Sequence, residues 1–270
     1  MENHARLRAL MRDQGLDALV AGTPENVFYL SGVRLLMQRL IPNRFSFVLL
    51  TADRSTLITV HSDADHARRD ATVDAVLEYG HTAPPLRVLS QASADAGLGR
   101  GRIGIETGFI PVSEFTGLSQ SLRGGELVAA EEIFQQARMR KNPDEIERLR
   151  CAQHRTELAV TAAMAMSQEG DTERQMAQKI GANLFAYGAE AVDFILLTIG
   201  INSTVFTCSP DPTGHAGGTS SISMSEAPST TTGRICRGTW ASARSPRDKG
   251  TLTPGSGMCS ERSSRASGPG

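Results

Sequence analysis

RLRALMRDQGLDALVA, residues 6–21, is the part of the chain from which its fold class follows. Leu7 and Met11 share one helix face, and Gly15 is positioned to end that helix. The apolar run from Leu16 to Ala21 has the length of a buried strand. A helix that leads directly into a strand begins the alternating pattern typical of an α/β fold.

The alternation continues to about residue 135. Short apolar runs predict further strands, and stretches with one apolar face predict further helices. The expected strands are Phe45–Leu50, Leu57–Val60, Ile103–Ile105 and Leu127–Val128, and the expected helices are Ala64–Asp70 and a segment with Val112, Phe115, Leu118 and Leu122 on one face. Residues 1–135 are therefore predicted to form one α/β domain, in which helices cover a sheet.

A second unit, residues 138–206, is predicted from the signals that start helices. Asn142 can cap a helix whose first residue is Pro143, and Glu145 can complete a capping box. The unit is expected to contain that helix to about Ser167, a helix capped by Thr172 with Gln175, and the strand Phe194–Ile199. The apolar stripe Met176, Ile180 and Leu184 of the second helix is expected to lack a full partner.

Residues 207–270 have a different composition. Of these 64 residues 38 are Ser, Gly, Thr or Pro, and the branched aliphatics are Ile222, Ile235 and Leu252. Such a segment buries too little apolar surface to offset the entropy lost on ordering. It is predicted to be a low-complexity tail without regular structure.

Two motifs resemble binding sites but have simpler interpretations. Gly99–Gly104 matches the letters of a dinucleotide glycine fingerprint, but it precedes a strand instead of following one, which favours a plain loop. His61–His66 holds four potential metal ligands, and acidic residues are also what the first turn of a helix prefers. A solvated helix start is therefore preferred to a metal site.

Other polar groups give weaker signals. Glu131 and Glu132 are expected on a solvated connection, and His215 has no ordered neighbours that would make it a base. Asn202-Ser203-Thr204 is a glycosylation sequon, which matters only in a secreted chain. No catalytic, cofactor-binding or metal-ligating residue is predicted within the sequence as given.

Charge and hydropathy limit the partners. The formal net charge is −1 with 21% charged residues, which gives no reason to expect nucleic acid or an acidic membrane surface. No apolar run approaches the ~20 residues of a membrane span. The expectation is a cytoplasmic protein without membrane contact.

Six segments together resemble one protein family. In order they are Leu16–Val20, Pro24–Gly32, Gly104–Glu106, Arg138–Ala152, Gly170–Glu173 and Gly200–Ser203. Their order and spacing are similar to those of the creatinase and Xaa-Pro aminopeptidase family over residues 1–206. The resemblance implies a small α/β N-terminal domain that helps to form a homodimer, followed by a pita-bread catalytic domain.

The same resemblance implies what an intact member would carry. Two Asp, one His and two Glu would hold two divalent metals, Mn, Co or Zn, that activate water against the peptide bond preceding proline. These ligands would all lie beyond Gly200–Ser203, where a substrate-handling His position is occupied here by Thr207. The catalytic domain is thus expected to be interrupted, and the chain as given to be inactive.

A displaced reading frame accounts for the tail. Serine codons beginning TC put T in the middle of the overlapping codon, and such codons encode apolar residues. Over Thr219–Ser225 the overlapping frame permits D-V-V-H-I-D-V, a strand bearing the first metal Asp implied by the resemblance. Loss of one nucleotide near the Phe206 codon is therefore the preferred interpretation of residues 207–270.

Three functions stay open on the sequence. The first is a metal-dependent Xaa-Pro peptidase by lineage, acting on Xaa-Pro peptides when intact. The second is a non-catalytic dimerisation or binding protein that keeps the N-terminal domain. The third is a creatinase-like amidinohydrolase, which would cleave a small guanidino substrate.

Overall fold

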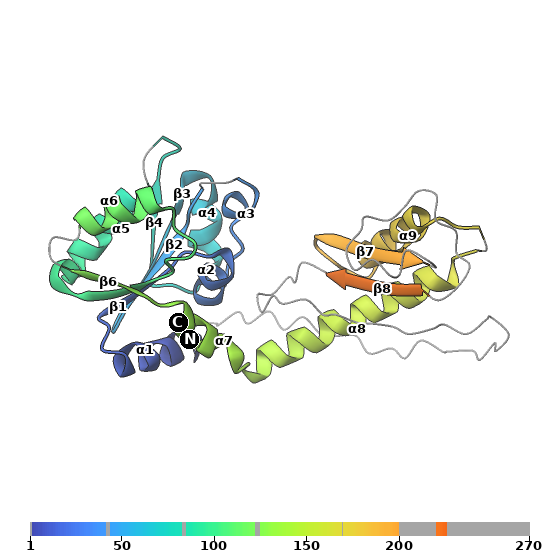
Figure 1. The fold of residues 1–270 in the computed structure, drawn as a ribbon, viewed down its shortest axis with the longest axis horizontal. Helices are drawn as coiled ribbons and strands as arrows, with labels where there is room; N and C mark the ends of the chain where they lie inside the picture. The colour runs from blue at the N-terminus through green and yellow to red at the C-terminus, as the bar shows by residue number, and fades with distance from the viewer. Residues whose placement is uncertain are drawn as a thin grey trace, which may run out of the picture. The chain divides into compact units, whose positions relative to one another are not determined.

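A computed structural model describes residues 2–41, 44–82, 85–121, 125–168, 170–199 and 220–225 (Figure 1). The described residues form two compact units, the first reaching Glu145 and the second starting at Ile146. The expected boundary near residue 135 lies inside a helix of the first unit. Each unit is described separately below.

The first unit is built on a six-stranded sheet in the order β4-β3-β2-β1-β5-β6. β2 is antiparallel to both β1 and β3, and the other neighbouring pairs are parallel. Its strands are β1 (Ala18–Ala21), β2 (Phe47–Thr51), β3 (Ser55–Val60), β4 (Ala75–Tyr79), β5 (Arg102–Ile105) and β6 (Glu126–Ala129). Its helices are α1 (Glu2–Asp13), α2 (Pro24–Ser31), α3 (Leu36–Leu40), α4 (His61–Asp70), α5 (Pro85–Asp95), the 3₁₀ turn η1 (Leu98–Arg100), α6 (Val112–Ser121) and α7 (Glu131–Met139).

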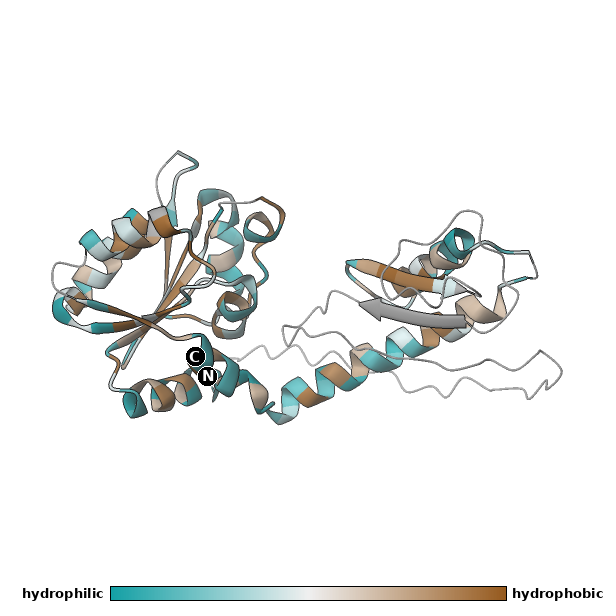
Figure 2. Cartoon of the chain, in the orientation of Figure 1, coloured by the Kyte–Doolittle hydropathy of each residue, from teal (hydrophilic) through white to brown (hydrophobic). Residues whose placement is uncertain are grey.

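Helices cover both faces of this sheet, and the apolar strands lie between them (Figure 2). β1 shows why, because all four of its residues are buried. Leu19 packs on one face with residues of α1, α2 and α7, whereas Val20 packs on the other with residues of α5 and α6. Successive side chains of a strand point to opposite faces, so a strand covered on both sides must be apolar throughout.

The strands and helices expected in the first unit are confirmed, although Leu122 lies outside the described residues, and five further elements besides the short η1 were not predicted. These are α2, α3, β4, α5 and α7. The expectation that Glu131 and Glu132 lie on a solvated connection is wrong, because they form the first turn of α7. Acidic side chains stabilise that end of a helix, so the pair carried a helix-start signal.

The glycine-rich stretch has a packing role and no helix follows it directly. Gly99 lies on η1, and Gly104 lies within β5. A Cβ added at Gly104 would come within 2.7 Å of Leu19 Cδ2 and 2.9 Å of Ala130 Cβ, whereas one at Gly99 would meet no atom within 4 Å. Within this stretch packing therefore requires a glycine at position 104 but not at position 99.

We expect Gly104→Ala to lower the free energy of unfolding by about 1–3 kcal/mol, because the core must move to admit the methyl group. Gly99→Ala is the matched control, with an expected change within about 0.5 kcal/mol. Urea denaturation of both variants measures the difference. Equal stabilities would show that the close contacts of Gly104 do not constrain the fold.

His4 is buried beneath the C-terminal end of α2, with 7% of its surface exposed. Its Nε2 lies 2.7 Å from the carbonyl oxygen of Leu30. Since a carbonyl only accepts, Nε2 carries the hydrogen and donates it. Burial lowers the pKa of His4 below its usual value of 6.5, because the charged ring would lose its hydration.

A lowered folded-state pKa makes His4 a source of acid sensitivity. His4 binds a proton near pH 6.5 in the unfolded chain, whereas in the folded chain it does so only at lower pH. The contribution of His4 to the free energy of unfolding is therefore present above pH 6.5 and is lost as the pH falls below it. We expect His4→Gln, which keeps a donor but cannot titrate, to flatten the fall in stability between pH 7 and about pH 5. Denaturation curves at each pH measure this, and parallel pH profiles for the two proteins would contradict it.

The second unit contains α8 (Pro143–Ala165), whose first turn belongs to the first unit, together with α9 (Glu173–Ala186), β7 (Phe194–Ile199) and β8 (Ser220–Ser225). Both predicted caps are present. Asn142 accepts from the Glu145 amide at 2.8 Å, and Thr172 forms a capping box with Gln175. The stripe Met176, Ile180 and Leu184, expected to lack a partner, is instead buried against Ala159, Ala163 and Leu197.

The prediction of no regular structure in 207–270 is wrong for Ser220–Ser225. This segment is β8, antiparallel to β7 in the register Phe194↔Ser225 to Ile199↔Ser220. The prediction considered buried side chains, whereas a strand edge offers backbone groups that pair with almost any extended segment. The rest of 207–270 lies outside the described residues.

Candidate functional site

A buried carboxylate anchors the corner where β1 turns into α2. Glu106 follows the end of β5 and is only 3% exposed. It accepts four hydrogen bonds, from the amides of Gly22 (2.6 Å) and Thr23 (2.9 Å), the Thr23 hydroxyl (2.8 Å) and Asn26 Nδ2 (2.6 Å). The surroundings thus replace the water that the carboxylate lost on burial.

The local sequence explains why these donors converge. Thr23 is the N-cap of α2, with its hydroxyl accepting from the Asn26 amide at 3.3 Å, and Pro24 is at the first helical position. Free amides and the helix dipole at this end favour a negative group. Because its oxygens are occupied by protein donors, Glu106 acts as a structural anchor and not as a base.

We expect Glu106→Gln to lower the free energy of unfolding by about 2–3 kcal/mol, because the new amide directs hydrogens at groups that also donate. Glu132→Gln, an exposed acid on α7, is the control with an expected change within about 0.5 kcal/mol. Thermal and urea unfolding measure both. A Glu106→Gln protein as stable as its control would refute the anchor.

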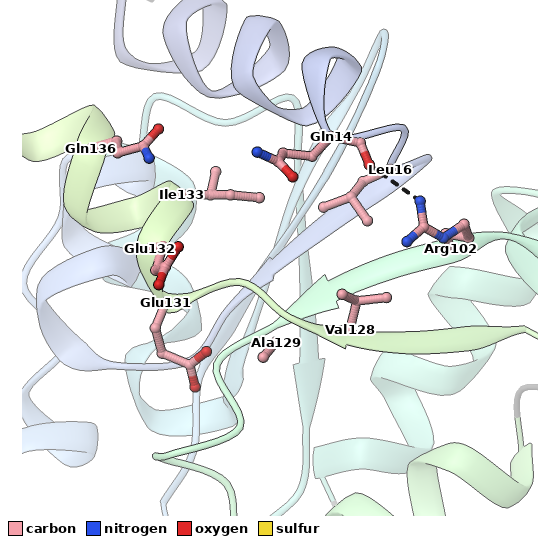
Figure 3. Close-up of a pocket in the computed structure, with 9 residues that line it drawn as sticks. All are labelled: Gln14, Leu16, Arg102, Val128, Ala129, Glu131, Glu132, Ile133 and Gln136. Carbon is pink, nitrogen blue, oxygen red and sulfur yellow. Dashed lines mark hydrogen bonds between the residues drawn. The ribbon is translucent and has the colours of Figure 1, made fainter.

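A pocket of about 430 Å³ lies beside β6, with apolar side chains on its floor and polar ones around it (Figure 3). Its lining consists of Gln14, Leu16, Arg102, Val128, Ala129, Glu131, Glu132, Ile133 and Gln136. The volume is within the range of small-ligand sites. No pair of nucleophile and base lies among these lining residues.

The His61–His66 segment is the start of α4, as preferred on the sequence, and its side chains do not converge. His61 Nδ1 lies 3.1 Å from Glu78 Oε1, and His66 Nδ1 lies 3.0 Å from Asp70 Oδ2. The interpretation as a solvated helix start is wrong for Asp63. It is buried and accepts from the Met37 amide at 3.1 Å, and burial raises its pKa.

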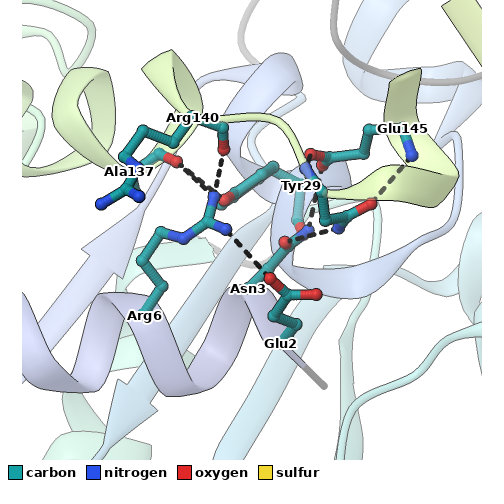
Figure 4. A network of polar contacts seen from close by, with 8 residues as sticks. Glu2, Asn3, Arg6, Tyr29, Ala137, Arg140 and Glu145 are labelled. Carbon is teal, nitrogen blue, oxygen red and sulfur yellow. Dashed lines mark hydrogen bonds and ion pairs between the residues drawn. The ribbon is translucent and has the colours of Figure 1, made fainter.

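A polar network holds the chain where the first unit ends (Figure 4). Arg6 donates to the carbonyl oxygens of Ala137 (3.0 Å) and Arg140, and the Tyr29 hydroxyl donates to Ala137 O at 3.1 Å. Asn3 donates to Glu145 Oε1 at 3.4 Å. Burial raises the pKa of Tyr29, which keeps its hydroxyl a donor. The first turn of α8 is thereby fixed to α1.

The described residues do not fit a divalent metal. Within them no group of three or more His, Cys, Asp or Glu has the arrangement of a metal site. β8 reads Ser-Ser-Ile-Ser-Met-Ser and offers no carboxylate or imidazole. Thr207, the sequon at Asn202 and the remaining polar candidates Asp211, His215, Glu226, Asp248 and Glu261 lie outside the described residues.

Comparison with known proteins identifies the first unit. The sequence profile of the creatinase/prolidase N-terminal domain matches residues 4–140. The chain belongs to this family. In the part that the structure describes, no helix is both long and apolar enough to cross a membrane.

Individual relatives extend the likeness beyond that domain. The protein YkvY of Bacillus subtilis (strain 168), whose name assigns it only provisionally to the dipeptidases, is 23% identical over 199 residues. These make up 74% of this chain but 54% of YkvY. The chain therefore spans about half the length of this curated relative.

Solved structures agree with the fold. The prolidase of Pyrococcus horikoshii OT3 matches with a TM-score of 0.66 and 20% identity, over 83% of this chain and 60% of its own. The Xaa-Pro dipeptidase of Bacillus anthracis matches with a TM-score of 0.68 and 15% identity, over 84% of this chain and 61% of its own. The α/β fold expected from the sequence is confirmed. The expected resemblance to the creatinase family is confirmed by the match of its N-terminal domain over residues 4–140.

Proposed function

We propose that this chain comes from a lineage of metal-dependent Xaa-Pro dipeptidases or aminopeptidases, and that the sequence as given lacks their activity. The family match over residues 4–140 supports the lineage, as does the similarity of the fold to that of a prolidase and an Xaa-Pro dipeptidase. The observation that carries the proposed inactivity is strand β8, which stands next to β7 without a metal-binding side chain.

The chemistry of such enzymes explains why β8 matters. A pair of divalent metals supplies an activated water and polarises the scissile carbonyl, and it needs several carboxylates and an imidazole to hold it. Serine hydroxyls and a methionine thioether do not replace carboxylates as ligands for hard cations. The hydroxyl-rich β8 therefore pairs with β7 but does not supply the carboxylate or imidazole ligands that such metals need.

The displaced reading frame supports the same proposal. The overlapping frame permits D-V-V-H-I-D-V over Thr219–Ser225, and the paired segment is Ser220–Ser225. An apolar strand bearing Asp at that place would both pair with β7 and present carboxylates. We infer that restoring one nucleotide near the Phe206 codon would restore a metal-binding catalytic domain.

The test compares two proteins, the 270-residue chain and the product of the gene with one nucleotide restored. Each is incubated with Mn²⁺, Co²⁺ or Zn²⁺ and Xaa-Pro dipeptides and longer Xaa-Pro peptides, and release of the N-terminal residue is measured. We expect metal-dependent turnover only from the restored form, because only its sequence supplies the carboxylates. A restored form with an Asp→Ala change in D-V-V-H-I-D-V serves as its matched control.

The outcomes separate the alternatives. Peptidase activity in the 270-residue form would contradict the proposed inactivity. A restored form that cleaves only a small guanidino compound would favour an amidinohydrolase, and one that is folded but without either activity would favour a non-catalytic binding protein.

Assembly and location are further parts of the proposal. A homodimer formed through the N-terminal domain and a cytoplasmic location are expectations from the resemblance and the sequence. Size-exclusion chromatography with light scattering tests the dimer, because a dimer has twice the mass of the 28.9 kDa chain.

A further inference from the structure

We propose that the outer edge of β6 and the adjoining pocket form a docking site for an extended segment of a partner protein that carries a Lys or Arg side chain. The proposal concerns the first unit alone and is independent of peptidase activity. It rests on the hydrogen-bonding edge of the strand, the form of the pocket and the charge of its lining.

β6 is the last strand of the sheet and pairs with β5. The Glu126 amide donates to Gly101 O at 2.9 Å, and the Ala130 amide donates to Ile105 O at 3.0 Å. Because backbone groups alternate along a strand, the amides of Leu127 and Ala129 point away from β5. Such an edge can pair with an extended peptide.

The pocket lies where a side chain of an added strand would fall. Glu126 and Val128 share one face of β6, and Val128 lines the pocket with Leu16 and Ile133. In Figure 3 Gln14 and Gln136 both lie on the side of the pocket away from Val128. Alternate side chains of an added strand would lie over Val128, so the aliphatic stem of a long side chain could rest there.

The charge of the pocket lining favours a positively charged group at the end of that side chain. Arg102 is already neutralised by Glu126, with Nε 2.8 Å from Oε2, and its Nη1 donates to Gly15 O at 3.0 Å. Glu131 accepts from the Thr107 hydroxyl and the Gly108 amide, each at 2.8 Å. The exposed Glu132 carboxylate makes no ion pair within the described chain, so the lining keeps a net negative charge.

The experiment titrates the 270-residue chain into fluorescein-labelled peptides STVKVTS and STVEVTS and follows fluorescence anisotropy. We expect saturable binding of the lysine peptide and binding at least about fivefold weaker for the glutamate peptide. The proposal would be overturned if the lysine peptide gave no saturable signal at protein concentrations up to about 1 mM. It would also be overturned if both peptides bound equally.

Two variants test the two parts of the site. Glu132→Gln removes the charge and should weaken lysine-peptide binding about threefold to fivefold. Ala129→Pro removes an outward amide without removing a bond to β5, and should weaken it about tenfold. Glu25→Gln removes another exposed first-turn acid, from α2, and should leave lysine-peptide binding unchanged.

Melting temperatures show that each variant is folded before binding is compared. Equal effects of Glu132→Gln and Glu25→Gln would overturn the charge selection. Full binding by a folded Ala129→Pro protein would overturn the strand addition.

Discussion

The Glu106 carboxylate is the constraint on which the first unit depends. It joins the end of β5 to the first turn of α2 through four donors, across 80 to 84 positions of sequence. A buried carboxylate is tolerated only where its hydrogen bonds are complete. The corner therefore has one geometry, which places α2 on the sheet face that α1 and α7 also cover. The contacts of α1 with the start of α8 depend on that placement, because Tyr29 of α2 belongs to the same network.

Local signals in the sequence were sufficient for much of this fold. The apolar strands and the caps at Asn142 and Thr172 need only neighbouring residues, and they are present as predicted. α2 was missed although Thr23, Pro24 and Gly32 mark its ends, and Gly32 adopts φ 71° at the C-cap. The role of Glu106 could not be predicted, since its donors become neighbours only after the sheet forms. The pocket beside β6 likewise combines residues from the segment after α1 and from β5, β6 and α7.

The second unit shows where composition misleads. Ser-Ser-Ile-Ser-Met-Ser has little apolar surface, yet it pairs with β7 along six residues. Backbone pairing accounts for this, because the apolar β7 offers an edge that must be satisfied. Leu197 and the stripe of α9 are buried, while Phe185 and Phe194 remain 56% and 44% exposed. The unit thus has a small core of its own and apolar surface that its described elements do not cover.

Metal content tests the central claim most directly, since the claim is that the chain has the family's N-terminal domain and lacks its metal-binding residues. The purified 270-residue chain would be equilibrated with Mn²⁺, Co²⁺ or Zn²⁺, freed of loosely bound ions, and measured by inductively coupled plasma mass spectrometry. We expect no stoichiometric metal. Two tightly bound ions per chain, the content of a two-metal hydrolase, would contradict it.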